Sequence, residues 1–112
     1  MYNKDELLFL NIQEATNKII AISNEFTSID DFKTHYIHYD AVMMNFIVIG
    51  EMAGKLSEDF KERNSSINWF KINGFRNIIA HDYFGVDDVV VWQIIKTKIP
   101  ELKLFIDSYL NL

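Results

Sequence analysis

The sequence predicts an all-α fold, an antiparallel bundle of about four or five helices in a single domain spanning residues 1–112. Apolar residues recur at helical spacing along most of the chain. With 4 Gly and 1 Pro, the chain has little of the turn chemistry that a β-sandwich or barrel needs. Apolar residues make up 49% of the chain and charged residues 24%, which is typical of a globular protein.

The first helix is expected from about Asn3 to Phe26. Asn3 and Glu6 have the spacing of a capping box, with Asn in place of the usual Ser or Thr. Leucine and isoleucine residues then repeat at helical intervals with polar residues between them. Residues 27–30 are expected to form a turn, with Asp30 as the N-cap of a short helix over residues 31–34.

A long second helix is expected from about Tyr36 or Asp40 to Arg63. Gly50 and Gly54 are four residues apart and therefore share a face. Each glycine costs about 1 kcal/mol inside a helix, so the pair predicts that another helix approaches closely there. The expected core face of this helix consists of apolar residues at helical spacing, Ala41, Met44, Val48, Met52 and Leu56, flanked by Phe46, Ile47 and Ile49.

A third helix is expected over residues 68–80, with Gly85 lying just past its end. The last helix should begin near residues 87–88. Pro100 is expected to break or kink this helix, because proline removes a backbone donor and clashes with the preceding turn. A final helical segment would then cover residues 102–110.

Composition and charge exclude several classes of protein. The 0 Cys rule out a disulfide framework and any thiolate metal site. A net charge of −5 disfavours a DNA-binding domain with a basic face, although a nuclease that contacts few phosphates remains compatible. The N-terminal residues lack the pattern of a signal peptide, and the longest apolar run, residues 41–50, is too short for a bilayer. We expect a soluble cytoplasmic protein with no membrane association.

The segment R-N-I-I-A-H-D-Y, residues 76–83, carries the candidate chemistry. Arg76 is a permanent cation suited to a phosphate, and His81 is suited to proton transfer near neutral pH. These are the groups needed for metal-free cleavage of RNA, in which a ribose 2′-OH attacks the adjacent phosphorus. His81 would act as general base or acid, Arg76 would stabilise the phosphorane, and Asn77 could orient either. No cofactor is implied.

The spacing restricts how this pair can act. Arg76 and His81 lie about 140° apart around a straight helix, so they do not converge on one phosphate. Either the helix ends near Ala80, or two copies of the segment meet across a two-fold axis and form a composite cleft. Plainer roles stay open: His81 could stabilise the C-terminus of the helix, and Tyr83 could be a core residue with a satisfied hydroxyl.

A second group of possible ligands precedes the long helix. His35 and His38 are three residues apart, with Asp31 and Asp40 nearby. A metal site is conceivable there, but two imidazoles do not make one. We therefore expect no metal at this position.

The string R-N-I-I-A-H-D-Y-F-G-V-D, residues 76–87, closely resembles the HepT-like proteins of the HEPN superfamily. Their signature is Arg-x₄₋₆-His, usually followed by x-Tyr. Residues 40–53, 69–74 and 91–102 also resemble the corresponding parts of the family, so the likeness covers nearly the whole chain.

The resemblance implies an all-α ribonuclease toxin of a bacterial toxin–antitoxin pair, with its cleft at a homodimer interface and RNA as the substrate. Arg76 and His81 would be the catalytic pair. Tyr83 would be the residue that a partner, an MntA-like minimal nucleotidyltransferase, adenylylates to silence the toxin. Supporting residues of the cleft would be Asn45, Glu51 and Asn77, although Glu51 could equally lie on a solvent-exposed face of its helix.

Two departures from the family leave a second function open. Many relatives have Arg where this chain has Met44, and Pro where it has Asn68. The missing cation could weaken RNA binding. The alternative is therefore a catalytically weak HEPN module that binds a nucleotide at Arg76 and Tyr83 and docks the nucleotidyltransferase. The net charge of −5 and Met44 favour this module slightly, whereas the presence of both motif residues favours the enzyme.

Overall fold

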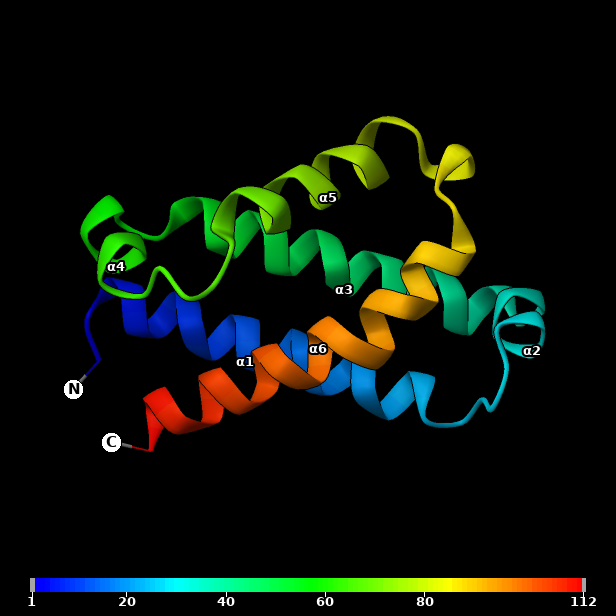
Figure 1. Cartoon of the computed structure of the whole chain (residues 1–112), viewed down its shortest axis with the longest axis horizontal. Helices are drawn as coiled ribbons and strands as arrows, with labels where there is room; N and C mark the ends of the chain where they lie inside the picture. The colour runs from blue at the N-terminus through cyan, green and yellow to red at the C-terminus, as the bar shows by residue number, and fades with distance from the viewer. Residues whose placement is uncertain (1, 112) are drawn as a thin grey trace.

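Residues 2–111, the part of the chain that the computed structural model describes, form six α-helices, one short 3-10 helix and no strand (Figure 1). The all-α prediction is confirmed. The elements are α1 (Lys4–Ser23), α2 (Ile29–Thr34), α3 (Tyr36–Lys55), α4 (Glu58–Arg63), α5 (Trp69–His81), the 3-10 helix η1 (Tyr83–Gly85) and α6 (Asp88–Leu110).

The long helices α1 and α3 pack side by side, α5 packs along α3, and α6 packs on α1 (Figure 1). The short helices α2 and α4 lie at opposite ends of the bundle. The capping box that begins α1 is present: Asn3 Oδ1 accepts from the Glu6 backbone N–H at 2.9 Å, and the Asn3 N–H donates to Glu6 at 3.2 Å. The most buried large side chains are Phe9, Ile12, Ile19, Phe32, Val42, Met43, Phe60, Ile79, Val91 and Ile106.

The core face of α3 differs from the expected one by a rotation about the helix axis. The buried residues are Val42, Met43, Phe46, Ile49, Gly50 and Ala53, of which Phe46 and Ile49 were expected to flank the core face. Of the expected set, Leu56 is buried, Ala41, Val48 and Met52 are half-buried, and Met44 is 59% exposed. Apolar residues surround nearly all of α3, so periodicity alone does not identify the side that faces the bundle.

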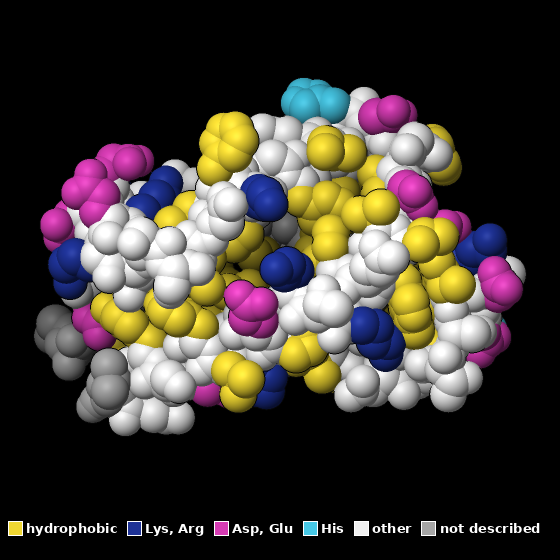
Figure 2. All heavy atoms as spheres, in the orientation of Figure 1, with side chains coloured by type: hydrophobic (Ala, Val, Ile, Leu, Met, Phe, Trp, Pro, Cys, Tyr) yellow, Lys and Arg dark blue, Asp and Glu magenta, His cyan; other side chains and the backbone are white. Residues whose placement is uncertain are grey.

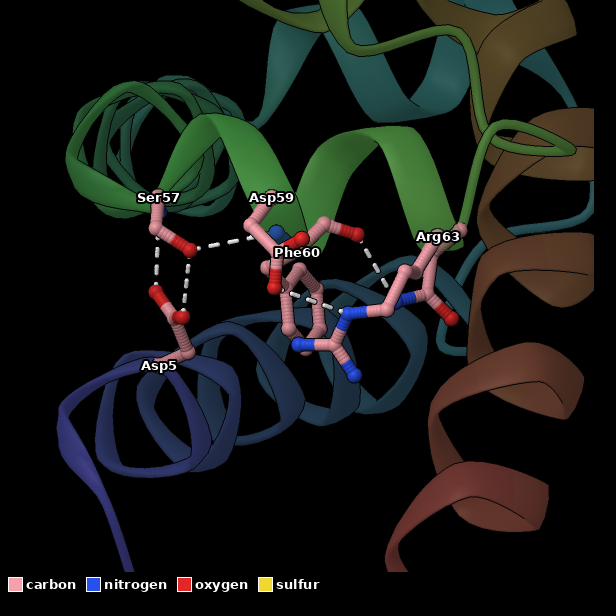
Figure 3. Close-up of polar contacts among 6 residues, drawn as sticks. Asp5, Ser57, Asp59, Phe60 and Arg63 are labelled. Atoms are coloured by element: carbon pink, nitrogen blue, oxygen red, sulfur yellow. Dashed lines mark hydrogen bonds and ion pairs between the residues drawn. The ribbon is translucent and has the colours of Figure 1, made fainter.

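Helix α3 ends at Lys55 and α4 begins at Glu58, where one continuous helix had been expected. Ser57 caps α4 by accepting from the Phe60 N–H at 3.1 Å (Figure 3). The Asp5 carboxylate on α1 accepts from the Ser57 N–H at 2.8 Å and from its hydroxyl at 2.6 Å. These bonds hold the pKa of Asp5 below its usual value. A contact from α1 therefore fixes the start of α4.

Two other boundaries differ from expectation. The N-cap of α2 is Ser28, whose hydroxyl accepts from the Asp31 N–H at 3.2 Å, and not Asp30. Helix α6 continues through Pro100 without a break. Buried side chains of α6 on both sides of the proline, Ile95, Ile99, Leu102 and Ile106, pack into the core. Tertiary packing therefore outweighs the cost of proline inside a helix.

The predicted close approach at Gly50 is confirmed, and the approaching helix is α5. A Cβ on Gly50 would overlap the Cβ of Arg76 and lie 2.6 Å from its Cγ. At Gly54 the nearest atom to an added Cβ would be Asn73 Oδ1, at 3.8 Å. The absence of a side chain at Gly50 therefore sets the distance between α3 and the helix that carries the motif. Within residues 2–111, no helix is long and apolar enough to cross a membrane.

Candidate functional site

Helix α5 carries the motif, and two hydrogen bonds fix its start. Its N-cap is Asn68, whose side chain accepts from the Lys71 N–H at 3.0 Å. The Trp69 indole N–H donates to the Asn64 carbonyl at 3.1 Å and fixes the first turn. The helix ends at His81, so the His81 side chain still leaves the axis about 140° from that of Arg76. Within one chain the two side chains therefore diverge.

Arg76 is held against α3 by an ion pair. Its Nη2 donates to Glu51 Oε1 at 3.1 Å, and its Nη1 donates to Asn77 Oδ1 at 3.0 Å. Its Nε is buried and has no partner among residues 2–111. Because a guanidinium has five donors, each terminal nitrogen keeps a further N–H beyond these two bonds. The structure thus brings together three predicted site residues and leaves Arg76 able to bind an anion.

His81 is an exposed side chain at the C-terminus of α5. An imidazolium is favoured at this end of a helix dipole, so the plainer capping role is compatible with its place. Exposure also leaves the ring accessible to a substrate or to a second protein chain. His81 is therefore available for proton transfer, but Arg76 of the same chain is directed elsewhere.

Tyr83 begins η1 and does not continue α5. Its hydroxyl donates a hydrogen bond to the Asp40 carboxylate on α3. The ring is half-buried and packs edge-on against Tyr39, with centroids 6.4 Å apart. Burial and the bond to Asp40 raise the pKa of Tyr83 above its ordinary value. Asp40 is the contact of Tyr83 that the sequence did not reveal.

Asp40 and Glu51 are two anchor points on one side of α3. They are eleven residues apart in the sequence, which is about three helical turns and returns nearly to the same direction. Glu51 contacts Arg76, and Asp40 contacts Tyr83. The spacing was a usable signal that the two carboxylates share a face, although it does not reveal what they contact.

The surface around these anchors carries exposed apolar side chains. Ile37 and Met44 lie on the same side of α3 as Asp40 by helical spacing, and they are 69% and 59% exposed. Phe84, next to Tyr83, is 98% exposed. Exposed apolar side chains that gather around one site are typical of an interface.

The motif lies apart from two hollows in the surface. One, of about 370 Å³, lies between α5 and α6, and Figure 2 shows hydrophobic side chains lining it with charged side chains beside them. The other, of about 750 Å³, lies beside α4 and the start of α5. Arg76, His81 and Tyr83 line neither hollow. The candidate site is therefore a surface of α3, α5 and η1.

The remaining candidates lie elsewhere. Asn45 Nδ2 donates to the Ala41 carbonyl of its own helix at 2.8 Å, and Asn45 lies about 120° around α3 from Glu51. His35 Nδ1 lies 2.7 Å from the Asp31 carbonyl oxygen, and His38 Nε2 lies 3.7 Å from Glu25. Among the residues described, no three His, Asp or Glu side chains are grouped to hold a metal ion.

Comparisons with known proteins agree on one family. The model of the family described as "Ribonuclease HepT-like" matches residues 12–109. A protein of Methanocaldococcus jannaschii named "Putative RNase" is 32% identical over 104 residues, covering 92% of this chain and 94% of the relative. The "Probable ribonuclease HepT" of Thermococcus cleftensis is 37% identical over 73 residues, covering 65% of this chain and 63% of the relative. No solved structure matches this chain.

Proposed function

Since this chain belongs to the ribonuclease HepT-like family, we propose that it is a metal-independent endoribonuclease and the toxin of a toxin–antitoxin pair. The observation that carries the proposal is that Arg76 is held in place yet can still bind an anion. Its guanidinium is oriented by Glu51 and Asn77 but keeps unused donors, and the exposed imidazole of His81 ends the same helix. Oriented donors of this kind stabilise the charge that develops on a phosphoryl group.

The proposed reaction uses the RNA's own 2′-OH as the nucleophile. The 2′ oxygen forms a bond to the adjacent phosphorus as its proton passes to an imidazole. The bond from phosphorus to the 5′ oxygen then breaks, and that oxygen takes up a proton from an imidazolium. Arg76 donates to the phosphoryl oxygens throughout. The products are a 2′,3′-cyclic phosphate and a 5′-hydroxyl.

We place this reaction between two copies of the chain. Arg76 and His81 diverge by about 140° on one helix, so a single chain does not direct both at one phosphate. Across a two-fold axis, His81 of one copy can face Arg76 of the other. The same contact would cover Ile37, Met44 and Phe84, which are exposed in the single chain.

Cleavage of RNA in the presence of a chelator tests the proposed reaction. Purified protein should cut single-stranded RNA at the same rate with and without EDTA, because the mechanism uses only side chains. The fragments should carry cyclic phosphate and 5′-hydroxyl ends, which mass spectrometry distinguishes. Loss of activity on chelation, or fragments with 5′-phosphate ends, would overturn this mechanism.

Tyr83 is the proposed control point, modified by an MntA-like minimal nucleotidyltransferase. Its hydroxyl donates a hydrogen bond to Asp40 on α3. On a continuous helix Tyr83 would share a face with Arg76, but α5 ends at His81, before Tyr83. Attachment of AMP would remove the hydroxyl proton and bring an anionic phosphate close to the Asp40 carboxylate. The two like charges repel, so η1 and the adjacent His81 would be displaced.

Tyr83→Phe should therefore stay toxic and escape silencing by the partner transferase. Phenylalanine keeps the ring that packs against Tyr39 but offers no oxygen to modify. Growth of cells that express both proteins, together with mass spectrometry of the toxin, measures the effect. Tyr36→Phe is the matched control, because Tyr36 is 70% exposed and lies outside the motif. Adenylylation found only on Tyr36, Tyr39 or Tyr109 would refute the assignment.

A catalytically weak module that docks the transferase is the second candidate. The ion pair between Arg76 and Glu51 favours it, since a carboxylate competes with phosphate for the guanidinium. In that case Glu51→Gln should raise nucleotide binding, and RNA should remain intact at every protein concentration. Cleavage by the wild-type protein excludes this candidate.

A further inference from the structure

The environment of Tyr83 sets it apart from the other tyrosines. The chain has 5 Tyr, and among residues 2–111 only Tyr83 has a hydroxyl bonded to another side chain. Tyr36 is far more exposed than Tyr83 but has no such partner. Exposure alone therefore does not single out one tyrosine, whereas contact with a carboxylate does.

The partner of this bond is well placed to accept a proton. Asp40 lies on α3, a helix of 20 residues in the bundle, and its carboxylate is at the surface. The Tyr83 proton is directed at Asp40, so the lone pairs of the phenol oxygen stay outside this bond. An electrophile can approach the oxygen while the proton remains on the carboxylate side.

The resting state of the phenol requires such a base. Tyr83 is held in its protonated form, because burial and the bond to Asp40 both raise its pKa. A neutral phenol is a weak nucleophile, and an adjacent general base activates it during the reaction. The phenol oxygen loses its affinity for the proton only as its bond to phosphorus forms, so attack and proton transfer occur together.

We propose that Asp40 is the general base for adenylylation of Tyr83. This inference rests on the proposed regulation and adds the group on the toxin that makes the tyrosine reactive. The Tyr83 oxygen attacks the α-phosphorus of ATP, which the transferase presents, and the bond from that phosphorus to the β-phosphate oxygen breaks. Pyrophosphate leaves, the phenol proton passes to Asp40, and Asp40 later releases it to water.

Asp40→Asn separates the proton-accepting role from the structural one. The amide oxygen still accepts the hydrogen bond from Tyr83, so η1 should keep its place, but the amide does not take up the proton. With purified transferase and ATP, we expect modification of Tyr83 to slow by about 10²–10⁴-fold, the range typical of a lost general base. Unmodified Asp40→Asn should cleave RNA like the wild type.

Asp88→Asn is the matched control. Burial and then the charge of Asp88 raise the pKa of Tyr39, and the Asp88 carboxylate lies 3.8 Å from Lys33 Nζ, but Asp88 does not bond to Tyr83. Its variant should be modified at the wild-type rate. Rapid modification of Asp40→Asn would overturn the inference. Loss of both modification and RNA cleavage in Asp40→Asn would also overturn it, because Asp40 would then be a structural residue. Failure of the wild type to be modified at Tyr83 would instead reject the proposed regulation itself.

Discussion

His81→Ala and Arg76→Ala are each expected to abolish RNA cleavage and leave the fold intact. Loss of a general acid or base typically costs about 10²–10⁴-fold in rate, and loss of an oriented donor at the phosphoryl group has a similar effect. His81 is exposed, so its removal leaves no cavity. At position 76 alanine keeps the Cβ that packs on Gly50. Initial cleavage rates and thermal unfolding measure the two effects separately.

The chain offers a control for each of these variants. His38→Ala removes an imidazole that lies beside Glu25, and Arg63→Ala removes a guanidinium that pairs with Asp59 at the surface. Both controls should keep wild-type cleavage. If His81→Ala retained full activity at wild-type stability, His81 would not be catalytic, and its remaining role would be to stabilise the C-terminus of α5.

Gly50→Ala is expected to have the largest effect on stability of any alanine substitution at a glycine. The new Cβ would overlap the Arg76 Cβ, and both atoms are attached directly to a backbone, so neither can rotate away. Helix α5 must therefore move from α3. Overpacking of this kind costs about 1–3 kcal/mol. Displacement of Arg76 from Glu51 should also lower RNA cleavage, which a simple loss of stability would not do at low temperature.

Gly74→Ala, in the same helix as Arg76, is expected to have the opposite effect on stability. A Cβ at Gly74 would meet no atom within 4 Å, so the substitution adds helix propensity without a clash. It should stabilise the protein by about 0.5–1 kcal/mol. Urea unfolding of both variants measures the difference. Equal stability of Gly50→Ala and Gly74→Ala would show that α3 and α5 do not pack as described.

Much of the fold follows from local sequence rules. The capping box of α1 and the close approach at Gly50 were readable because each depends on two residues at a fixed helical spacing. The break after Lys55 was missed although Ser57, followed by two acidic residues, is an N-cap signal. The apolar pattern of α3 was given more weight than that signal. The expected break at Pro100 was wrong for the opposite reason. Packing of α6 on both sides of the proline outweighs the tendency of proline to end a helix.

For the candidate site as well, some residues could be predicted from the sequence and others could not. Arg76 and His81 were proposed from residue type and spacing, whereas the roles of Tyr83 and Glu51 came from resemblance to the family. Asp40 was not identified, because its contact with Tyr83 depends on where α5 ends and on the path of η1 back toward α3. Such a contact is tertiary, so no periodicity in the sequence reports it.

Mixed dimers test directly whether two copies of the chain build one ribonuclease site. Arg76→Ala and His81→Ala chains, each with a different affinity tag, are co-expressed, and the dimer that carries both tags is purified and checked by sedimentation. Each mixed dimer would hold one site with an intact arginine from one chain and an intact histidine from the other. We expect this dimer to cleave RNA although neither variant does so alone. A mixed dimer as inactive as its parents, or a wild-type monomer that still cleaves RNA, would contradict a site shared between two copies.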